Sequence, residues 1–405
     1  MPRALARLMP MPCQPAGQWK PYLTVLKDGA LTNGVIDAWP RRQTAGIARQ
    51  VARAGCKSML DGLGRAAVNY SMITNRRNFI RALGGGAGFA LAARGAAAQD
   101  PPAWYRGNLH AHTINSDGDS PPYDVLAWYK RNGYQFLAIT DHNTFTDPAR
   151  FDTNPNDKFL LIGAEEVTNP MTVHINAIGV TRTIPAQSGS TVTEILQAGI
   201  DAIRAAGGIP LINHPNFQWA FTAKEMLPLR GVGLLEIASG HPRVNSDGDG
   251  TIPSHEQMWD QLLSAGMRIF GVAVDDVHNF RDEFSIDRAN PGRGWVVVRA
   301  RALSREAILA ALSSGDFYAS TGVTLKDIQS TPQTLTVEIQ PDAPAASSPK
   351  RYRVVFVGKG GNVLSVSRQN PASYTFKGNE SYVRARIEDS GGRRAWTQPV
   401  FLPGG

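Results

Sequence analysis

The sequence predicts an α/β fold followed by a smaller all-β part, and three observations lead to this prediction. From about residue 104 to 322, apolar β-prone runs alternate with helical patterns, as they do in α/β domains. Glycines lie just beyond the helical patterns, where left-handed helix caps favour them. After residue 322 the helical signal ends, and apolar and polar side chains alternate with a period of two.

Each element of the α/β part follows from its local pattern. The expected strands are the apolar runs 106–110, 135–140, 159–163, 172–180, 209–213, 232–238, 269–274 and 295–299. The expected helices are 123–132, 192–206, 255–265 and 304–314. The glycines that follow them are Gly133, Gly207, Gly266 and Gly315. The repeated strand–helix order favours a barrel-like parallel sheet.

The C-terminal part is expected to form a small antiparallel β-sandwich of about 80 residues. Its expected strands are 333–340, 351–357, 362–367 and 381–387. Clusters of Pro, Gly and Ser separate these strands, among them PDAPAASSPK at 341–350.

The balance of charge differs along the chain. The whole chain has 42 Lys and Arg against 34 Asp and Glu, a formal net charge of +8, which alone would favour nucleic acid or an anionic surface as a partner. Residues 1–98 hold 14 basic and 3 acidic residues, which leaves 28 basic and 31 acidic residues in 99–405. The basic character belongs to the front of the chain, so no nucleic-acid partner is expected.

The segment 72–98 resembles a twin-arginine export signal. It has a polar start with the pair Arg76–Arg77, then two apolar residues and a Gly/Ala/Leu stretch, and it ends in three alanines at 96–98. It departs from the pattern at Asn75, where Ser or Thr is usual. A basic amphipathic helix is the alternative. An export signal implies the twin-arginine machinery as a partner and a periplasmic or otherwise exported protein.

Residues 1–71 precede this signal, although such signals normally stand first in a chain. The segment is rich in Pro, Gly and Arg. We interpret it as a disordered upstream over-extension of a protein that starts at Met72, and a short extra domain is the alternative. Both cysteines, Cys13 and Cys56, lie here, so neither disulfides nor thiolate ligands are expected in 99–405. No run of about 20 apolar residues occurs, so no stable membrane span is expected.

Four short clusters of histidine and acidic residues carry the main functional signal. They are NLHAHT at 108–113 with SDG at 116–118, ITDH at 139–142, INHP at 212–215 and DDVH at 275–278. Each follows an apolar β-prone run, and strand ends are where α/β folds build their sites. Side chains at i and i+2 of a strand share a face, so His110 and His112 can aim at one point, as can Asp276 and His278. A single such pair would be weak, but five of the eight histidines lie in these clusters, which predicts one metal site.

Together these motifs resemble the PHP superfamily, the polymerase and histidinol phosphatase domain. The family's His-x-His with Ser-Asp-Gly, Thr-Asp-His, Glu-containing strand end, His-Pro and Asp-x-His occur in order over about 104–322. The strings closest to its carbaryl-hydrolase-like (CehA/McbA-like) branch are RGNLHAHT, EEVT at 165–168, HINAIGV at 174–180, GDFYASTG at 315–322 and GGRRAWTQPVFL at 391–402. The resemblance implies a distorted (β/α)7 barrel of PHP type at 99–322, followed by the β-sandwich-like domain at 323–405.

The resemblance also implies a set of metal ligands. The residues that match the family's ligand positions are His110, His112, Asp117, His142, Glu166, His174, His214, Asp276 and His278. By that analogy two or three divalent ions bind, and Glu166 bridges two of them. The implied groups are His110, His112, Glu166 and Asp276; Glu166, His174 and His214; and Asp117, His142 and His278. Such ligands suit zinc, manganese or iron(II), a choice that the sequence leaves open.

Five further residues near these motifs receive other roles. Glu165 would point to the strand face opposite the bridging glutamate, although it is the alternative ligand there. Asp141 is expected to orient an imidazole or cap a turn. His241 and His255 match no motif and are expected on the surface or in the substrate pocket. Arg293 is a candidate substrate-binding residue that would contact an oxyanion or a phosphate, with a solvated loop arginine as the alternative.

The expected chemistry follows from clustered divalent ions, which lower the pKa of a shared water and stabilise charge on the attacked group. We therefore expect an exported metal-dependent hydrolase of a small molecule, with phosphoester cleavage by a metal-bridged hydroxide as the leading hypothesis. A carboxylic ester or carbamate hydrolase of the same fold is the first alternative. A non-catalytic exported protein that binds metal or carbohydrate is the second. No Gly-x-Ser-x-Gly motif occurs, so a serine nucleophile is not required.

Overall fold

The computed structural model describes residues 22–27, 30–35, 101–151, 158–281, 284–341 and 350–402. The chain divides into two compact units, Met1–Gly95 and Ala96–Gly405. In the first unit, strands β1 (Tyr22–Lys27) and β2 (Ala30–Val35) pair antiparallel. The rest of the expected upstream segment, with both cysteines, and the whole expected export signal lie outside the described residues. Among the described helices, none is long and apolar enough to cross a membrane.

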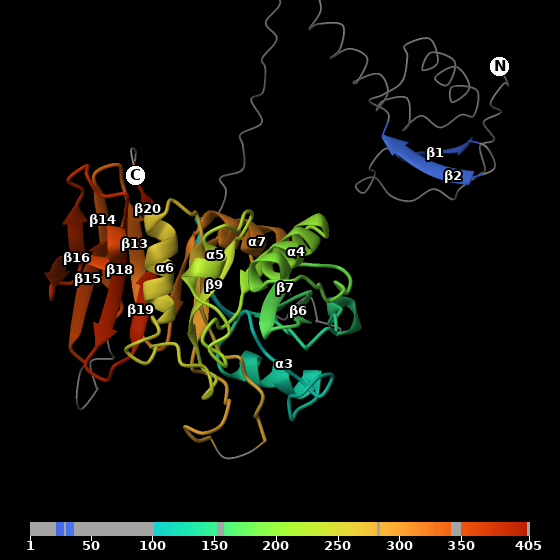
Figure 1. Ribbon diagram of the computed structural model, residues 1–405, viewed down its shortest axis with the longest axis horizontal. Helices are drawn as coiled ribbons and strands as arrows, with labels where there is room; N and C mark the ends of the chain where they lie inside the picture. Colours follow the sequence, from blue (N-terminus) through green and yellow to red (C-terminus); the bar gives the residue numbers. More distant parts are fainter. Residues whose placement is uncertain are drawn as a thin grey trace, which may run out of the picture. The chain divides into compact units, whose positions relative to one another are not determined.

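The first two thirds of the second unit alternate strands with helices (Figure 1). The strands are β3 (Ala103–Asn108), β4 (Phe136–Ala138), β5 (Leu160–Ile162), β6 (Ala164–Asn169), β7 (Val173–Ile178), β8 (Ile209–Ile212), β9 (Leu234–Ser239), β10 (Phe270–Val274), β11 (Trp295–Ala300) and β12 (Phe317–Ser320). The helices are α3 (Pro122–Arg131), α4 (Val192–Ala205), α5 (Ala223–Met226), α6 (His255–Ser264) and α7 (Arg305–Ser314), with a 3-10 turn, η2, at Pro148–Arg150. Every predicted strand and helix of this part has a counterpart, whereas β6, β12 and α5 were not predicted.

The helices begin and end at residues suited to these positions. The side chains of Thr191, Ser254 and Ser304 each accept a hydrogen bond from the backbone N–H three residues on, at the starts of α4, α6 and α7. Gly315 caps the end of α7 with a φ of 80°, a left-handed conformation that other residues adopt only with strain.

The α/β part has a mixed arrangement of strands in two sheets. One sheet has the order β10-β9-β8-β7-β6, and β3, β4, β5, β11 and β12 belong to a second, larger sheet. β9 pairs parallel with β8 and β10, but β7 pairs antiparallel with both β6 and β8, because the turn at 170–172 reverses the chain directly. Isolated bridges join Ala111 to Val277 and His142 to Glu166. The fold is therefore α/β but not purely parallel, and a closed seven-stranded barrel stays a prediction.

The C-terminal part consists of antiparallel strands, in keeping with its period-two pattern. Strands β13 (Leu325–Ser330), β14 (Thr334–Ile339) and β17 (Ala372–Thr375) form a three-stranded sheet. Strands β15 (Tyr352–Gly358), β16 (Asn362–Ser367), β18 (Tyr382–Asp389), β19 (Arg394–Thr397) and β20 (Val400–Phe401) belong to the larger sheet, with a 3-10 turn, η3, at Lys359–Gly361. The two sheets share an apolar core in which Phe356 stacks on Tyr374 with ring centroids 5.6 Å apart. β19 pairs with β12, so hydrogen bonding continues across the boundary predicted at 322/323.

Helix α6 connects the two parts through a buried ion-pair cluster, and it lies beside the C-terminal strands in Figure 1. Arg384 of β18 is buried and donates to Asp260 of α6 through Nε, at 2.8 Å, and through Nη2, at 2.6 Å. Its Nη2 also lies 2.7 Å from Glu256. These contacts fix the helix, and thereby the loop that precedes it, against the C-terminal sheet.

Candidate metal centre

The nine residues that the sequence predicts as ligands lie together at one edge of the α/β part. They follow β3 (His110, His112, Asp117), β4 (His142), β8 (His214) and β10 (Asp276, His278), or lie within β6 (Glu166) and β7 (His174). His174 stands near the start of β7, which runs antiparallel to β6 and β8, so it is close to their ends. The nine make up four overlapping groups whose ligand atoms are close enough to share an ion. These buried clusters fit a centre with more than one metal ion.

The first group, which comprises His110, His112, Glu166 and Asp276, brings two imidazoles close to two carboxylates. Nε2 of His110 lies 3.1 Å from Nε2 of His112 and 3.4 Å from Oε2 of Glu166. It is also 3.3 Å from Oδ1 of Asp276. Nε2 of His112 lies 3.3 Å from the same oxygen of Glu166 and 3.5 Å from that of Asp276. Ligands about 2.0 to 2.1 Å from one ion are separated by roughly 3.3 Å in a tetrahedral site, so each imidazole lies at a suitable distance from both carboxylates to share an ion with them.

Glu166 directs its two oxygens to two different groups. Oε2 faces His110 and His112, whereas Oε1 lies 3.0 Å from Nδ1 of His174 and 3.4 Å from Nε2 of His214. Oε2 is buried, and Nδ1 of His142 also lies 3.0 Å from it. A buried carboxylate is unfavourable unless its charge is compensated, and a cation bound among these imidazoles would compensate it. Glu166 therefore has the position and the chemistry of a bridging ligand.

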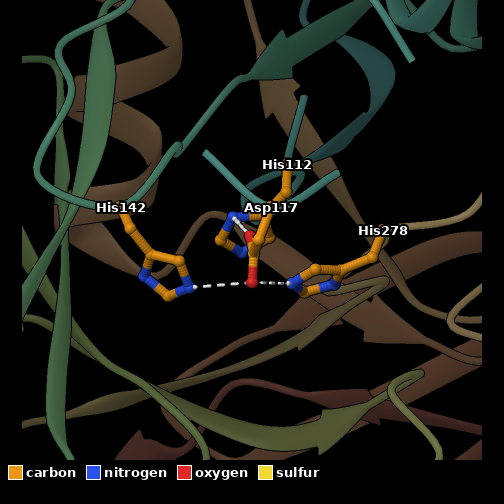
Figure 2. A group of neighbouring side chains, drawn as sticks. All are labelled: His112, Asp117, His142 and His278. Carbon is orange, nitrogen blue, oxygen red and sulfur yellow. Dashed lines mark ion pairs between the residues drawn. The ribbon is translucent and has the colours of Figure 1, made fainter. Parts of the chain in front are cut away.

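A third group lies on the more open side of the centre. Oδ2 of Asp117 is 3.5 Å from Nε2 of His142 and 3.3 Å from Nε2 of His278 (Figure 2). The side chain of Asp117 is 53% exposed, whereas those of the first group are at most 5% exposed. Nδ1 of His112 faces Oδ1 of Asp117 at 3.4 Å, so the His112 ring lies between the first group and this one. This group is therefore the most exposed part of the centre.

Two supporting residues were not recognised in the sequence. Glu236 of β9 places Oε1 2.6 Å from Nδ1 of His110, and its Oε2 accepts the backbone N–H of His214 at 2.9 Å. Asn213 donates from Nδ2 to Oε1 of Glu166 at 2.8 Å. Such contacts orient ligands and fix the tautomer of an imidazole. Glu236 could have been recognised because it stands inside the apolar run LLEIA. A carboxylate in a buried strand is unfavourable without a partner, so it indicates a polar site.

Asp141 organises the loop that carries Asp117. One of its oxygens, Oδ1, accepts the backbone N–H of Thr113 at 2.7 Å and the hydroxyl of Ser116 at 2.8 Å. The other, Oδ2, accepts the hydroxyl of Thr113 at 2.7 Å. Asp141 thus caps a turn, one of the two roles expected for it.

Glu165 points away from the centre, to the other face of β6. Its Oε1 accepts the backbone N–H of Ile184, and the residue belongs to none of the four possible metal groups of the described chain. Burial raises the pKa of Glu165 to about 7.

Carboxylates of the centre favour the protonated forms of His110 and His142 when no ion competes, whereas burial and the neighbouring His278 lower the pKa of His112 to about 4. Burial alone would lower the pKa of His142, but hydrogen bonds to Asp117 and Glu166 outweigh it and raise this pKa to about 10. The pKa of His110 is raised well above its usual value, because Asp276, Glu166 and Glu236 outweigh the effect of burial. An ion must displace these protons to bind.

Backbone strain is concentrated around the centre. Among the described residues, the non-glycine positions with positive φ are Asn143, Met171, Thr172, Gln218, Trp219 and Asp276. Each is a member of the nine or stands within five residues of one. Such conformations are unfavourable by about 1 to 3 kcal/mol each and gather at functional sites.

The three remaining candidates occupy different places. His255, expected on the surface or in the pocket, is instead fully buried, and its Nε2 accepts the backbone N–H of Asn216 at 3.1 Å. His241 lies beside the centre, with its ring edge-on to that of His278 at 5.2 Å between centroids. Arg293 donates through Nη1 to the carbonyl of Gly240 at 3.0 Å and through Nη2 to a second loop carbonyl, so it braces these loops. A direct contact of Arg293 with substrate stays a prediction.

Comparisons with known proteins give a distant likeness. No family model matches the chain, and no curated protein matches it. A two-domain protein from Bacteroides vulgatus that contains a predicted PHP-like metal-dependent phosphoesterase is similar in structure, with 15% identity, coverage of 71% of this chain and 92% of that one, and a TM-score of 0.41. The lesion-specific endonuclease PfuEndoQ from Pyrococcus furiosus has 16% identity, 52% and 56% coverage and a TM-score of 0.35. An amidohydrolase from Chromobacterium violaceum has 16% identity, 45% and 93% coverage and a TM-score of 0.30.

Proposed function

We propose that this protein is an exported, metal-dependent phosphoesterase of the PHP type that binds two or three divalent ions. Bound ions of this kind acidify water and stabilise negative charge on the group under attack. The observation that carries the proposal is the position of Glu166, with one oxygen toward His110 and His112 and the other toward His174 and His214. A carboxylate shared between two histidine groups is the arrangement that a multinuclear centre needs.

The residues of the chain have distinct parts in this proposal. The residues of the first group, which include Glu166, are buried, and hydrogen bonds from Glu236 and Asn213 hold two of them in place. Such a preorganised group needs no rearrangement during the reaction. Asp117, His142 and His278 face the open side, where a substrate group would meet them. A phosphoryl group presents several nonbridging oxygens at once, and three groups of ligands can serve them together.

A carboxylic ester or carbamate hydrolase is the second candidate. A carbonyl carbon under attack develops a single oxyanion, for which two ions suffice. The two candidates therefore differ in what they require of the third group, Asp117, His142 and His278.

Substitution of Asp117 by asparagine separates the two candidates. Asp117→Asn keeps the shape of the side chain and removes its charge, so we expect a loss of one ion per chain and a fall of about a hundredfold or more in kcat/KM for phosphoesters, the scale of losing one electrostatic contact to the reacting group. The measurement is elemental analysis together with kcat/KM for an aryl phosphate and an aryl ester, in wild type and variant. Asp147→Asn, at a surface turn, is the control. Strong aryl-ester or carbamate turnover that Asp117→Asn leaves unchanged, with little phosphoester turnover in wild type, would establish the second candidate instead.

Periplasmic localisation is part of the same proposal and is supported by the segment 72–98. A centre assembled from segments distant in sequence suits export of a folded, metal-loaded protein. Replacement of both Arg76 and Arg77 by lysine should leave the precursor inside the cell, as followed by fractionation and immunoblot. Replacement of Arg94 by lysine, later in the same segment, is the control. Unchanged export of the Arg76/Arg77 variant would contradict export by the twin-arginine machinery and would leave the proposed phosphoesterase activity unaffected.

A further inference from the structure

Two loops form a wall along one side of the metal centre. One carries Phe217 and follows the ligand His214, and the other carries His241 and Arg243 and follows β9. An isolated antiparallel bridge between Phe217 and Val244 joins them. This bridge joins the two loops beside the metal centre.

Phe217 is the half-buried ring of this wall and contacts the centre directly. Its ring centroid lies 5.2 Å from that of His214 and 6.3 Å from that of His174. His241 approaches the same ring edge-on, with centroids 6.1 Å apart. The Phe217 ring therefore lies directly beside the predicted ligands, where it can contact an apolar part of a substrate.

Arg243 places a cation above this ring. Its guanidinium carbon lies 5.8 Å from the centroid of Phe217, and no ion pair joins Arg243 to a carboxylate among the described residues. The Phe217 and His214 ring centroids are 5.2 Å apart. The distance from the guanidinium carbon to the His214 ring centroid is therefore at most the sum of these two distances. That reach matches a small molecule with one end at the ions and the other at Arg243.

His241 adds a hydrogen-bond donor to the same wall. Its Nδ1 accepts the backbone N–H of Arg243 at 3.2 Å, so a neutral imidazole carries its proton on Nε2. Among the described residues, the hydrogen bond of this imidazole ring is the one at Nδ1, which leaves Nε2 to donate to a ligand. The residue is only 8% exposed, so the donor is held in place and is not a free surface group.

The wall is braced from outside the centre. Asn216 donates to the carbonyl of Asn245 at 2.8 Å, and Arg293 donates to that of Gly240 at 3.0 Å. Farther along the loop, Asp247 pairs with Arg394 of the C-terminal sheet at 2.6 Å. A rigid binding wall needs such support, and the C-terminal part supplies some of it.

We propose that Phe217, His241 and Arg243 form a subsite for the part of the substrate that points away from the metals, and that this part is an aromatic or other flat apolar group bearing a negative charge. The ring packs against Phe217, and its anionic substituent pairs with Arg243 and accepts from Nε2 of His241. This proposal rests on the proposed function in one respect: the reacting group of the substrate is taken to bind at the metal ions.

Paired phosphonates test the subsite without turnover. Phenylphosphonate and 4-carboxyphenylphosphonate place the same group at the ions, and they differ only in the charge that would reach Arg243. In metal-loaded wild type we expect calorimetry to show about fivefold tighter binding of the carboxylated compound, the scale of one exposed ion pair. In Arg243→Gln most of this preference should be lost at unchanged metal content, and only the contribution of His241 should remain. Arg230→Gln, beyond the opposite end of β9, should keep the wild-type preference.

The outcomes separate the subsite from the proposed function. Equal binding of the two phosphonates by wild type, or a preference that Arg243→Gln leaves undiminished, would overturn the subsite even if phenyl phosphate is hydrolysed. A preference that Arg243→Gln diminishes supports the subsite even if no phosphoester is turned over. Phe217→Leu should weaken both phosphonates, and unchanged binding there would remove the ring from the subsite.

Discussion

Glu236 lies directly behind His110, with its Oε1 2.6 Å from Nδ1 on the side of the ring away from the other ligands. The imidazole is therefore held with Nε2 toward the centre, and the carboxylate increases its strength as a ligand. Glu236→Gln keeps the size of the side chain but removes its charge. We expect it to weaken metal binding by about 10- to 100-fold, measured by competition with a chromogenic chelator.

A matched control lies on the surface of the same unit. Glu306 has an 80% exposed side chain in the first turn of α7, and Glu306→Gln should leave metal affinity unchanged. Equal metal affinity in Glu236→Gln and wild type would show that His110 does not need its carboxylate partner, or that it is no ligand.

Metal binding should release protons at neutral pH. The pKa of His142 is raised to about 10 because hydrogen bonds to Asp117 and Glu166 outweigh burial, so without an ion this ring is protonated at pH 7. A raised pKa means that protons compete with the ion up to that pKa, so the apparent affinity should rise as pH increases from 7 toward 10. Calorimetric titration with metal in two buffers of different ionisation enthalpy measures the release. Identical heats in both buffers would contradict it.

Most of the predicted ligands could be grouped from the sequence because they stand at short spacings after apolar strand-like runs. His110 and His112 stand two residues apart, and their Nε2 atoms are 3.1 Å apart in the structure. His174 depended on family resemblance, because an isolated histidine in an apolar run carries no spacing signal. The division of these residues into groups depends on contacts between distant segments. For example, His112 faces both Asp117 and Glu166, which the sequence does not reveal.

The parts that sequence could not give depend on contacts between distant segments. Strand β6 begins just after Gly163, where an added Cβ would lie 2.6 Å from the carbonyl oxygen of Val180. The apolar run shows no such break, so β5 and β6 could not be told apart. His255 was expected to be accessible, but its role is to accept a hydrogen bond from Asn216, 39 residues away.

Removal of Arg384 should destabilise the whole second unit. Its guanidinium neutralises Glu256 and Asp260, which are nearly buried, so Arg384→Met leaves two carboxylates without their main partner. Breaking a buried ion pair in this way lowers the free energy of unfolding by about 3 to 5 kcal/mol. Chemical denaturation checks this value. Arg353→Met, on neighbouring β15 with a 57% exposed side chain, should lower it by less than about 1 kcal/mol.

Neutralisation of both acids should recover part of this loss. In Arg384→Met/Glu256→Gln/Asp260→Asn no buried charge lacks a partner, so the triple variant should be more stable than Arg384→Met alone. A triple variant less stable than the single one would indicate that packing on Trp259, 4.9 Å from the guanidinium carbon, is the main contribution of Arg384.

The third group of ligands should depend on a residue that does not touch an ion. Asp141 accepts from the backbone N–H and hydroxyl of Thr113 and from the hydroxyl of Ser116, directly before Asp117. Asp141→Ala removes all three acceptors, so the loop loses the contacts that hold Asp117 near His278. We expect the variant to keep the ions at Glu166 and to lose the one at Asp117, measured by elemental analysis.

The buried and open groups should therefore respond differently to the same substitution. The first group is buried and is supported by contacts such as that of Glu236, and the bond from the backbone N–H of Glu166 to the carbonyl of Asp141 does not depend on the Asp141 side chain. Asp117 is half exposed and depends on the loop that the Asp141 side chain holds. Asp141→Ala should then lower phosphoester turnover to the level of Asp117→Asn, and the two changes together should cost little more than either alone, because they remove the same ion. Loss of every ion in Asp141→Ala would instead show that this loop supports the whole centre. A full metal complement with reduced turnover would assign Asp141 a part in the reaction itself.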